Sequence, residues 1–405
     1  MSSTPRTVTS EDVPSWLGSM MRTFFRPPVA EMVEHYRTAI DLSRALGVFD
    51  DGEAVATLRS VAQEFTVPGL ETIPVSALTN VTVAATHRRR GILTDMITRD
   101  LSSSAERGEV ASILVASEWP IYGRYGYGPA VFSNRLSVDT TAIRFTQPVM
   151  GAVEFCDTDE FDRVAPAIYD RHRRQQPGSI LRDEHWWDRD LRRALGGADV
   201  NKSFQAIYRA PSGEEEGYVM WMPEPKVDDM RTETSLRVEA LVSTTTRAYH
   251  ALWHFLCTSD LQRSVTAALR PVDEVLPLLL DDGRRVRTLG QHDFVWVRLL
   301  DVPRALSART YGTSGSLVID VQDSLAHAHG RYRLSAEGSV AQCERTTDAA
   351  DLRVSVAALG SVYLGGMSWA AHADAGAVNE ETPGALELSD RLFRTARAPW
   401  NNTWF

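Results

Sequence analysis

Residues 80–97 read NVTVAATHRRRGILTDMI, the pattern of a strand followed by a basic turn and a helix. Val81 and Val83 alternate with smaller residues, as in a strand. Beyond Gly91 the apolar side chains fall on one helical face: Ile92, Leu93, Met96, Ile97 and Leu101. A turn at Gly91 directs the unpaired N–H groups of the helix start toward one point, and three arginines precede it. This turn is therefore predicted to bind an anion, with phosphates as the natural ligand.

The same pattern also fits an ordinary solvated helix start, so the turn alone identifies no ligand. Two other phosphate-binding loops are excluded by the residues themselves. No Gly-Lys-Ser/Thr follows the glycine, as a Walker loop requires, and the G-x-G-x-x-G of a dinucleotide-binding fold is missing.

Composition indicates an ordinary globular protein of two or three domains. The chain has 405 residues, of which 43% are hydrophobic and 24% charged. It contains no apolar run of about 18 residues and no apolar leader, so neither a membrane span nor secretion is predicted. The cysteines at 156, 257 and 343 lack metal-ligand spacing. We therefore expect a cytoplasmic protein without a bound metal, in which these cysteines are small buried side chains.

The formal net charge of −10 disfavours nucleic acid as a partner, because proteins that neutralise phosphates usually present a basic face. Solubility alone accounts for an acidic surface. Attraction of a cationic amine substrate is a second explanation.

Three segments with different patterns follow one another. Residues 1–148 predict a mixed α/β domain with a hairpin turn at Asp51-Gly52 and a helix from Gly91 to about Arg107. Residues 149–295 predict a helix near 160–174 and then repeat the outline of strand, threonine-containing turn and helix at 235–257. This repeat lacks the basic turn, so it reads as a duplicated fold without the anion site, or as an unrelated α/β domain. Residues 296–405 predict strands at 316–321 and 330–335 and a helix around 385–395.

Two further features carry chemistry. Residues 121–128 read IYGRYGYG and offer three tyrosine hydroxyls, at Tyr122, Tyr125 and Tyr127. The sequence ends with Trp404-Phe405, and an aromatic end is expected to be tucked into the protein, since polar, fraying termini are the norm. A tucked α-carboxylate is a usable base when desolvation raises its pKa.

The pattern Arg88-x-x-Gly91 after a strand resembles the pyrophosphate loop of the GCN5-related N-acetyltransferases, although Leu93 stands where a small residue is usual. The tyrosine motif and the aromatic end resemble those of the Eis (enhanced intracellular survival) family within that group. This resemblance covers the whole chain. It implies two tandem acetyltransferase folds of α/β type, the second degenerate, followed by a sterol-carrier-protein-like α+β domain, with boundaries near residues 148 and 295.

The resemblance also implies roles for particular residues. Tyr122 is expected to be the proton donor and the C-terminal carboxylate of Phe405 the proton acceptor. The acetyl-CoA site would comprise Val81, Thr82, Val83, Arg88, Arg89, Arg90, Gly91, Ile92, Leu93, Thr94, Ser117 and Glu118. Candidates for the amine pocket are Trp16, Phe24, Phe25 and Glu31.

The predicted function is therefore acetyl-CoA-dependent N-acetylation of primary amines by direct transfer in a ternary complex. Small polyamines, aminoglycoside-like compounds and lysine side chains are the acceptors considered. The family implies a homohexamer. The alternative is a non-catalytic scaffold that binds coenzyme A or a lipid, and Leu93 is the feature that favours it.

Overall fold

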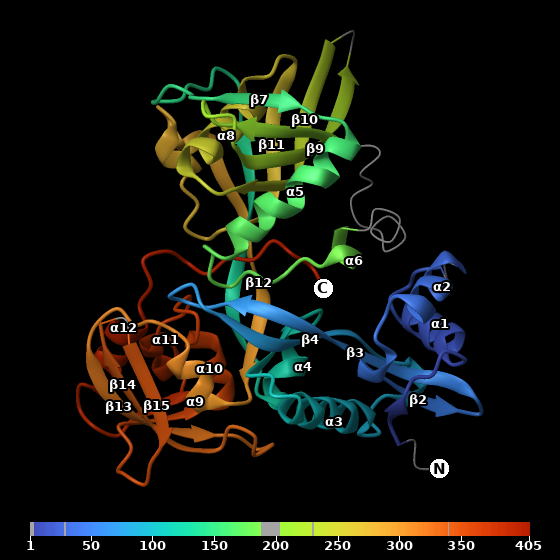
Figure 1. The fold of residues 1–405 in the computed structure, drawn as a ribbon, viewed down its shortest axis with the longest axis vertical. Coiled ribbons are helices and arrows are strands. Elements are labelled where there is room, and N and C mark those ends of the chain that lie inside the picture. The colour runs from blue at the N-terminus through green and yellow to red at the C-terminus, as the bar shows by residue number, and fades with distance from the viewer. Residues whose placement is uncertain (1–3, 28–29, 188–202, 229–230, 339) are drawn as a thin grey trace. The chain divides into compact units, whose positions relative to one another are not determined.

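A computed structural model describes residues 4–27, 30–187, 203–228, 231–338 and 340–405 (Figure 1). The chain forms two compact units, each assembled from segments that are far apart in sequence. The first unit comprises Met1–Val131, Asp293–Ala396 and Trp404–Phe405, and the second comprises Phe132–His292 and Arg397–Thr403. Each unit is described by itself.

The larger sheet of the first unit has the strand order β1-β2-β3-β4-β5-β12. The strands are β1 (Arg6–Thr7), β2 (Ala45–Asp50), β3 (Glu53–Thr66), β4 (Thr72–Val83), β5 (Ala111–Val115) and β12 (Val286–Leu299), whose residues from 293 onward belong here. β2 and β3 are antiparallel, and Asp51 and Gly52 between them both have positive φ, which confirms the predicted tight turn.

The helices of this part are α1 (Val13–Thr23), α2 (Ala30–Thr38) and α3 (Ile92–Glu106), with short 3₁₀ turns η1 (Leu42–Arg44) and η2 (Ala85–His87). α3 connects the parallel strands β4 and β5 and packs on β3 and β4, as Figure 1 shows. The side chains of Met96, Ile97 and Leu101 on its inner face are fully buried, which confirms the helix predicted from the apolar spacing.

Strand β4 changes its pairing in its second half. Opposite β3, Thr57 pairs with Thr82 but Arg59 pairs with Thr79, so an extra residue of β4 forms a bulge in which Asn80 has a φ of 53°. On the other side, parallel pairing with β5 covers only Val75–Leu78. From Thr79 to Val83, this edge of β4 therefore has no partner among the described strands.

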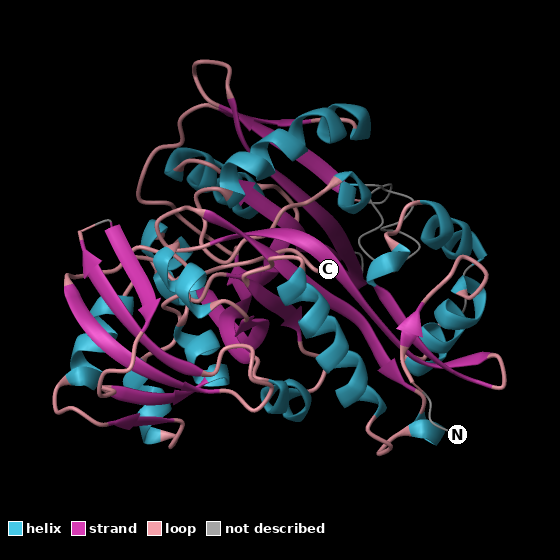
Figure 2. Ribbon diagram, turned by 60° about the horizontal axis from the view of Figure 1, so that its bottom comes forward, coloured by secondary structure: helices cyan, strands magenta, loops and turns pink. Residues whose placement is uncertain are grey.

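A second sheet in the first unit has the order β15-β14-β13-β16-β17. Its strands are β13 (Gly315–Gln322), β14 (Gly330–Glu337), β15 (Val340–Arg345), β16 (Leu352–Ser355) and β17 (Val378–Glu380). The accompanying helices are α9 (Val302–Ser307), α10 (Val356–Val362), α11 (Trp369–Asp374) and α12 (Ala385–Phe393). In Figure 2 helices are drawn in cyan and strands in magenta. The strands predicted at 316–321 and 330–335 and the helix predicted around 385–395 are confirmed.

The second unit contains a sheet of order β6-β11-β10-β9-β8-β7. Its elements are β6 (Gly128–Asp139), β7 (Ala152–Phe155), α5 (Thr158–Arg173), α6 (Glu184–Trp187), β8 (Phe204–Arg209), β9 (Glu215–Asp228), β10 (Arg231–Ser243), α8 (Thr246–Thr258), β11 (Gln262–Arg270), η4 (Leu276–Leu279) and η5 (Gly283–Arg285). β10 and β11 are parallel and joined by α8, so the predicted repeat of the β4–α3 outline is confirmed.

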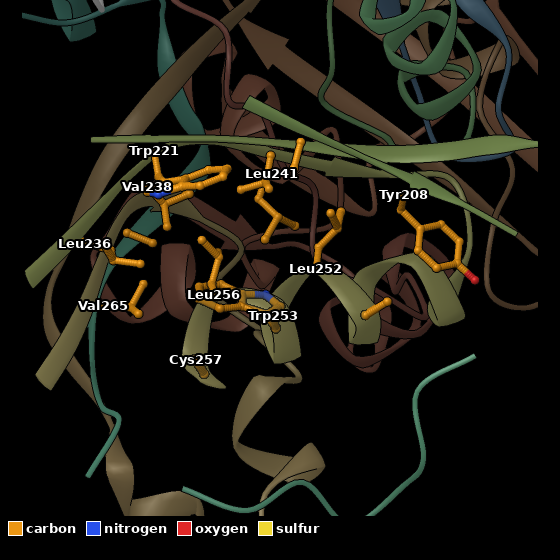
Figure 3. Close-up of a cluster of buried hydrophobic side chains, with 14 of the residues drawn as sticks. Tyr208, Trp221, Leu236, Val238, Leu241, Leu252, Trp253, Leu256, Cys257 and Val265 are labelled. Carbon is orange, nitrogen blue, oxygen red and sulfur yellow. The ribbon is translucent and has the colours of Figure 1, made fainter. Parts of the chain in front are cut away.

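Buried side chains join α8 to this sheet. Figure 3 shows Trp221 of β9 and Leu241 of β10 pointing toward Leu252 and Leu256 of α8. All four are at most 6% exposed, so this helix is fixed on the sheet by a dry core. Among the helices that the structure describes, none has both the length and the hydropathy of a membrane span.

Candidate active site

The predicted anion-binding turn forms the start of α3. Gly91 is the residue before the helix and has a φ of +81°, a left-handed conformation that favours glycine. The space around it is open, so backbone conformation rather than crowding requires glycine at this position. Gly91 has no side chain with which to cap the helix. The N–H groups of Ile92, Leu93 and Thr94 therefore face outward without an intrahelical acceptor, which is the geometry of an anion site.

The three arginines of the turn are exposed but differ in their contacts. Arg90 Nη2 donates a 3.0 Å hydrogen bond to the carbonyl oxygen of Thr86 and so braces the turn. Within the described part of the chain, the side chains of Arg88 and Arg89 have no hydrogen-bond or ion-pair partner. Two guanidinium groups are therefore available for a ligand beside the positive end of the α3 dipole.

Leu93, the departure from the usual small residue, is accommodated by the core. Its half-buried side chain packs against a cluster that includes Met96, Leu101 and Tyr122. The extra bulk is thus directed into the domain rather than across the turn.

The unpaired edge of β4 adjoins this turn. Val81 and Val83 pack against the same core cluster, and Thr82 is held by a 2.7 Å hydrogen bond between its hydroxyl and that of Thr57. Backbone N–H and C=O groups along an unpaired strand edge can bind an extended ligand in the manner of an added strand. The basic turn and the unpaired strand edge are therefore consecutive in the chain.

The tyrosine motif lies next to the start of α3. It follows Ser117 and Glu118, which are exposed, and comprises a short helix α4 (Trp119–Tyr122), a 3₁₀ turn η3 (Gly123–Tyr125) and the beginning of β6. The hydroxyls of Thr94 and Tyr125 are 3.1 Å apart, which joins the two predicted motifs.

The three tyrosines differ in the hydrogen-bond partners of their hydroxyls. Tyr125 is engaged with Thr94, and Tyr127 is fully buried with its hydroxyl 2.7 Å from that of Ser112. The ring of Tyr122 meets that of Tyr127 edge to face at 6.1 Å, but its hydroxyl has no hydrogen-bond partner among the described residues. Burial of Tyr122, with Glu118 and Tyr125 nearby, raises the pKa of its hydroxyl to about 12. Tyr122 is thus the protonated hydroxyl that is free to donate.

The end of the sequence is tucked in only in part, because Phe405 is half-buried but Trp404 is 60% exposed. Thr79 Oγ1 donates a 3.0 Å hydrogen bond to a backbone oxygen of Phe405, and the ring of Trp404 meets that of Phe294 edge to face at 5.0 Å. Phe405 therefore lies at the residue where β4 leaves its pairing with β5. Thr79 has no signature in the sequence, because a threonine within a strand is ordinary, and this contact spans 326 residues.

The candidates for an amine pocket are more dispersed. Trp16 is 1% exposed and donates its indole N–H to the carbonyl oxygen of Leu46, so it is a core residue. Phe24 and Phe25 are exposed on the segment after α1. The side chain of Glu31 lies outside the described residues.

The equivalent helix start in the second unit is closed. The Thr245 hydroxyl accepts a hydrogen bond from the N–H of Ala248 and so caps α8 internally. The Thr245 hydroxyl also donates to the carboxylate of Glu216, which is ion-paired with Arg247. A carboxylate at this position repels phosphate. Of the two parallel strand–helix–strand motifs, the one with Gly91 has the open, basic helix start.

Three family models match the chain. Two that describe a GNAT acetyltransferase domain match residues 4–130 and 178–299, and one that describes a sterol carrier protein domain matches residues 302–402.

Relatives match it over most of its length. An uncharacterized N-acetyltransferase of Streptomyces avermitilis is 39% identical over 404 residues, 98% of this chain and 97% of the relative. N-acetyltransferase Eis of Mycobacterium tuberculosis is 34% identical over 353 residues, 83% of each chain. The crystal structure of Eis1 from Mycobacterium abscessus is 33% identical with a TM-score of 0.88, covering 99% of this chain and all of that one.

Proposed function

Because this chain belongs to the Eis family of GCN5-related N-acetyltransferases, we propose that its first unit transfers the acetyl group of acetyl-CoA directly to a primary amine. The chain is an N-acetyltransferase with two GNAT domains followed by a sterol-carrier-like domain. The observation that carries the proposed mechanism is the position of Phe405, which is hydrogen-bonded to Thr79 on the strand whose free edge follows.

The proposed acetyl-CoA site runs from the turn along β4. Arg88, Arg89 and Arg90 supply positive charge for the diphosphate, and the N–H groups of residues 91–94 supply hydrogen bonds. The backbone of Val81–Val83 pairs with the pantetheine arm. Ser117 and Glu118, between β5 and the tyrosine motif, lie beside the bound cofactor in this proposal. Leu93 no longer favours a scaffold without activity, since its side chain packs into the core.

The proposed chemistry uses one base and one acid. The carboxylate of Phe405 takes one proton from the substrate ammonium through a water molecule, and the neutral nitrogen then attacks the thioester carbon. The second proton of the nitrogen is lost to solvent as the tetrahedral intermediate collapses. N–H groups near Val83 stabilise the negative charge that develops on the carbonyl oxygen. The carbon–sulfur bond then breaks and Tyr122 donates its proton to the leaving thiolate. Since the raised pKa keeps Tyr122 protonated, it is suited to this step at neutral pH.

The proposed acceptors are small polyamines, aminoglycoside-like compounds or lysine side chains. All are cations before they react, and the net charge of −10 favours their approach. The test is a thiol-release assay with acetyl-CoA and a panel of such amines, each amine omitted in turn. Amine-dependent release of coenzyme A supports the proposal. Acetyl-CoA binding without release by any amine would favour a scaffold.

Three further family properties are proposed on the same basis: a cytoplasmic location, a homohexameric assembly, and domain boundaries near residues 148 and 295. Sedimentation velocity of the full chain tests the assembly. Separate expression of residues 1–148 and 149–295 tests whether those boundaries delimit folded pieces.

A further inference from the structure

The backbone turn that carries Tyr122 into β6 is tightly enclosed. Gly126 follows η3 with a φ of +85°, and a Cβ atom there would overlap Arg298 Nη1 and lie 2.6 Å from Val356 Cγ1. Glycine is therefore required at 126 both by its conformation and by its neighbours. One of these neighbours, Val356, is the first residue of α10, in the sterol-carrier-like domain.

Gly128 makes a still closer approach to the same helix. Its φ is not left-handed, yet a Cβ atom would overlap the carbonyl oxygen of Ala357 and lie 2.9 Å from the backbone nitrogen of Ser361. Ser361 Oγ also donates a 2.6 Å hydrogen bond to the carbonyl oxygen of Pro129. The turn thus rests on the backbone of α10 with no side chain between them.

Helix α10 also contacts the neighbouring strand β12 closely. A Cβ atom at Gly360 would overlap the carbonyl oxygen of Val297 in β12. The next residue of β12, Arg298, is fully buried and forms a 2.9 Å ion pair with Asp323. Asp323 in turn accepts hydrogen bonds from the N–H groups of Leu325 and Ala328. α10 is consequently in close backbone contact with both β12 and the tyrosine turn.

On the basis of the proposed proton-donor role of Tyr122, we propose that α10 of the sterol-carrier-like domain positions this tyrosine for catalysis. The Tyr122 hydroxyl has no hydrogen-bond partner among the described residues, so the backbone of the turn determines where it lies. Displacement of a catalytic group by about 1 Å can cost about a hundredfold in rate. The third domain would then contribute to catalysis by holding the tyrosine turn in place.

The test compares glycine variants in the same turn. Gly128→Ala introduces the overlap with α10, and Ser361→Ala removes the hydrogen bond to Pro129 without adding an atom. Gly123→Ala is the matched control, because Gly123 has helical φ and ψ and nothing within 4 Å of an added Cβ. We expect Gly123→Ala to keep kcat within about twofold, Ser361→Ala to lower it severalfold, and Gly128→Ala to lower it by about tenfold or more. The KM for acetyl-CoA should stay within about twofold in all three.

Double variants that also carry Tyr122→Phe distinguish an effect on the position of Tyr122 from a general loss of structure. If α10 acts through Tyr122, then Ser361→Ala and Gly128→Ala will not further reduce the residual kcat of Tyr122→Phe. Equal losses in both backgrounds, or an unchanged kcat in the single variants, would overturn the inference. If Gly128→Ala does not fold, Ser361→Ala carries the same comparison. Full turnover in Tyr122→Phe alone would instead refute the proton-donor role, and so the two failures are distinguishable.

Discussion

Thr79 Oγ1 and a backbone oxygen of Phe405 lie 3.0 Å apart and form a hydrogen bond between strand β4 and the end of the sequence. Thr79 is also the first residue of β4 beyond its pairing with β5. The proposed base is therefore held at the point where the proposed acetyl-CoA arm would begin to pair with the strand.

Replacement of Thr79 tests this arrangement. Thr79→Ala removes the hydroxyl that holds Phe405, and a hydrogen bond to a charged group contributes about 1.5–3 kcal/mol, so we expect kcat to fall about tenfold or more. Thr79→Ser keeps the hydroxyl and serves as the control. Steady-state kinetics with saturating acetyl-CoA measure both variants. Equal rates for the alanine and serine variants would show that the contact does not position the base.

Extension of the sequence tests the base more directly. One glycine added after Phe405 moves the α-carboxylate by about 3.5 Å, and loss of a general base costs about a hundredfold or more in rate. The same residue added before Met1 is the control. Unchanged turnover in the extended protein would exclude the carboxylate of Phe405 as the base.

The raised pKa of Tyr122 leads to a prediction about how kcat depends on pH. Because burial raises the pKa of its hydroxyl to about 12, the donor stays protonated throughout the range below that value. In the wild-type protein we therefore expect no fall in kcat between pH 8 and pH 10 from ionisation of the donor. Tyr122→Phe should lower kcat by about a hundredfold at every pH in this range and leave acetyl-CoA affinity nearly intact. Tyr125→Phe is the comparison, and a larger loss in that variant would reassign the donor.

The arginines of the turn should differ in their effects. Arg88→Gln and Arg89→Gln each remove a free guanidinium, and a hydrogen bond to a charged group contributes about 1.5–3 kcal/mol, so the Kd for acetyl-CoA should rise about tenfold or more. The exposed Arg135 on β6 supplies the control variant Arg135→Gln. Titration calorimetry at two salt concentrations measures the change, and equal Kd values for all three variants would rule out this turn as the phosphate site.

A carboxyl on the buried face of α3 makes the stability of the first unit depend on pH. Burial raises the pKa of Asp100 to about 6 although Ser60 donates a 2.8 Å hydrogen bond to it. The folded protein thus favours the neutral form of the Asp100 carboxyl. The contribution of this group to the free energy of unfolding is therefore lost as the pH rises through 6. Asp100→Asn should therefore stabilise the protein more at pH 8 than at pH 5, by at most about 3 kcal/mol.

Denaturant unfolding at the two pH values measures this difference. The exposed Asp95→Asn on the same helix is the control. A stabilisation of Asp100→Asn that is equal at pH 5 and pH 8 would contradict the assignment of a buried, neutral carboxyl.

Local patterns in the sequence predicted the elements well, because spacing and turn residues act over a few positions. Gly91, Asp51 and Gly52 adopt the left-handed conformations expected of them, and α3 buries the predicted face. The choice among three tyrosines had no local signal, since it depends on hydroxyl partners such as Ser112 and Thr94.

Other features depend on neighbours that are distant in sequence. Trp16, a candidate for the amine pocket, is buried in the core, and Leu93, where a small residue is usual, packs against the core. The closure of the second helix start required Glu216 to meet Thr245, residues on separate elements. Periodicity does not report such pairings, which follow from the assembled sheet.

The contrast between Gly91 and Thr245 has a consequence for the free protein. Thr245 gives α8 its own cap, whereas α3 begins at a residue that offers none. Without a ligand, the N–H groups at the start of α3 are therefore left to solvent, although side chains of its first turn pack against the core. A bound diphosphate would accept hydrogen bonds from these N–H groups, so the coenzyme would act as the missing cap of α3.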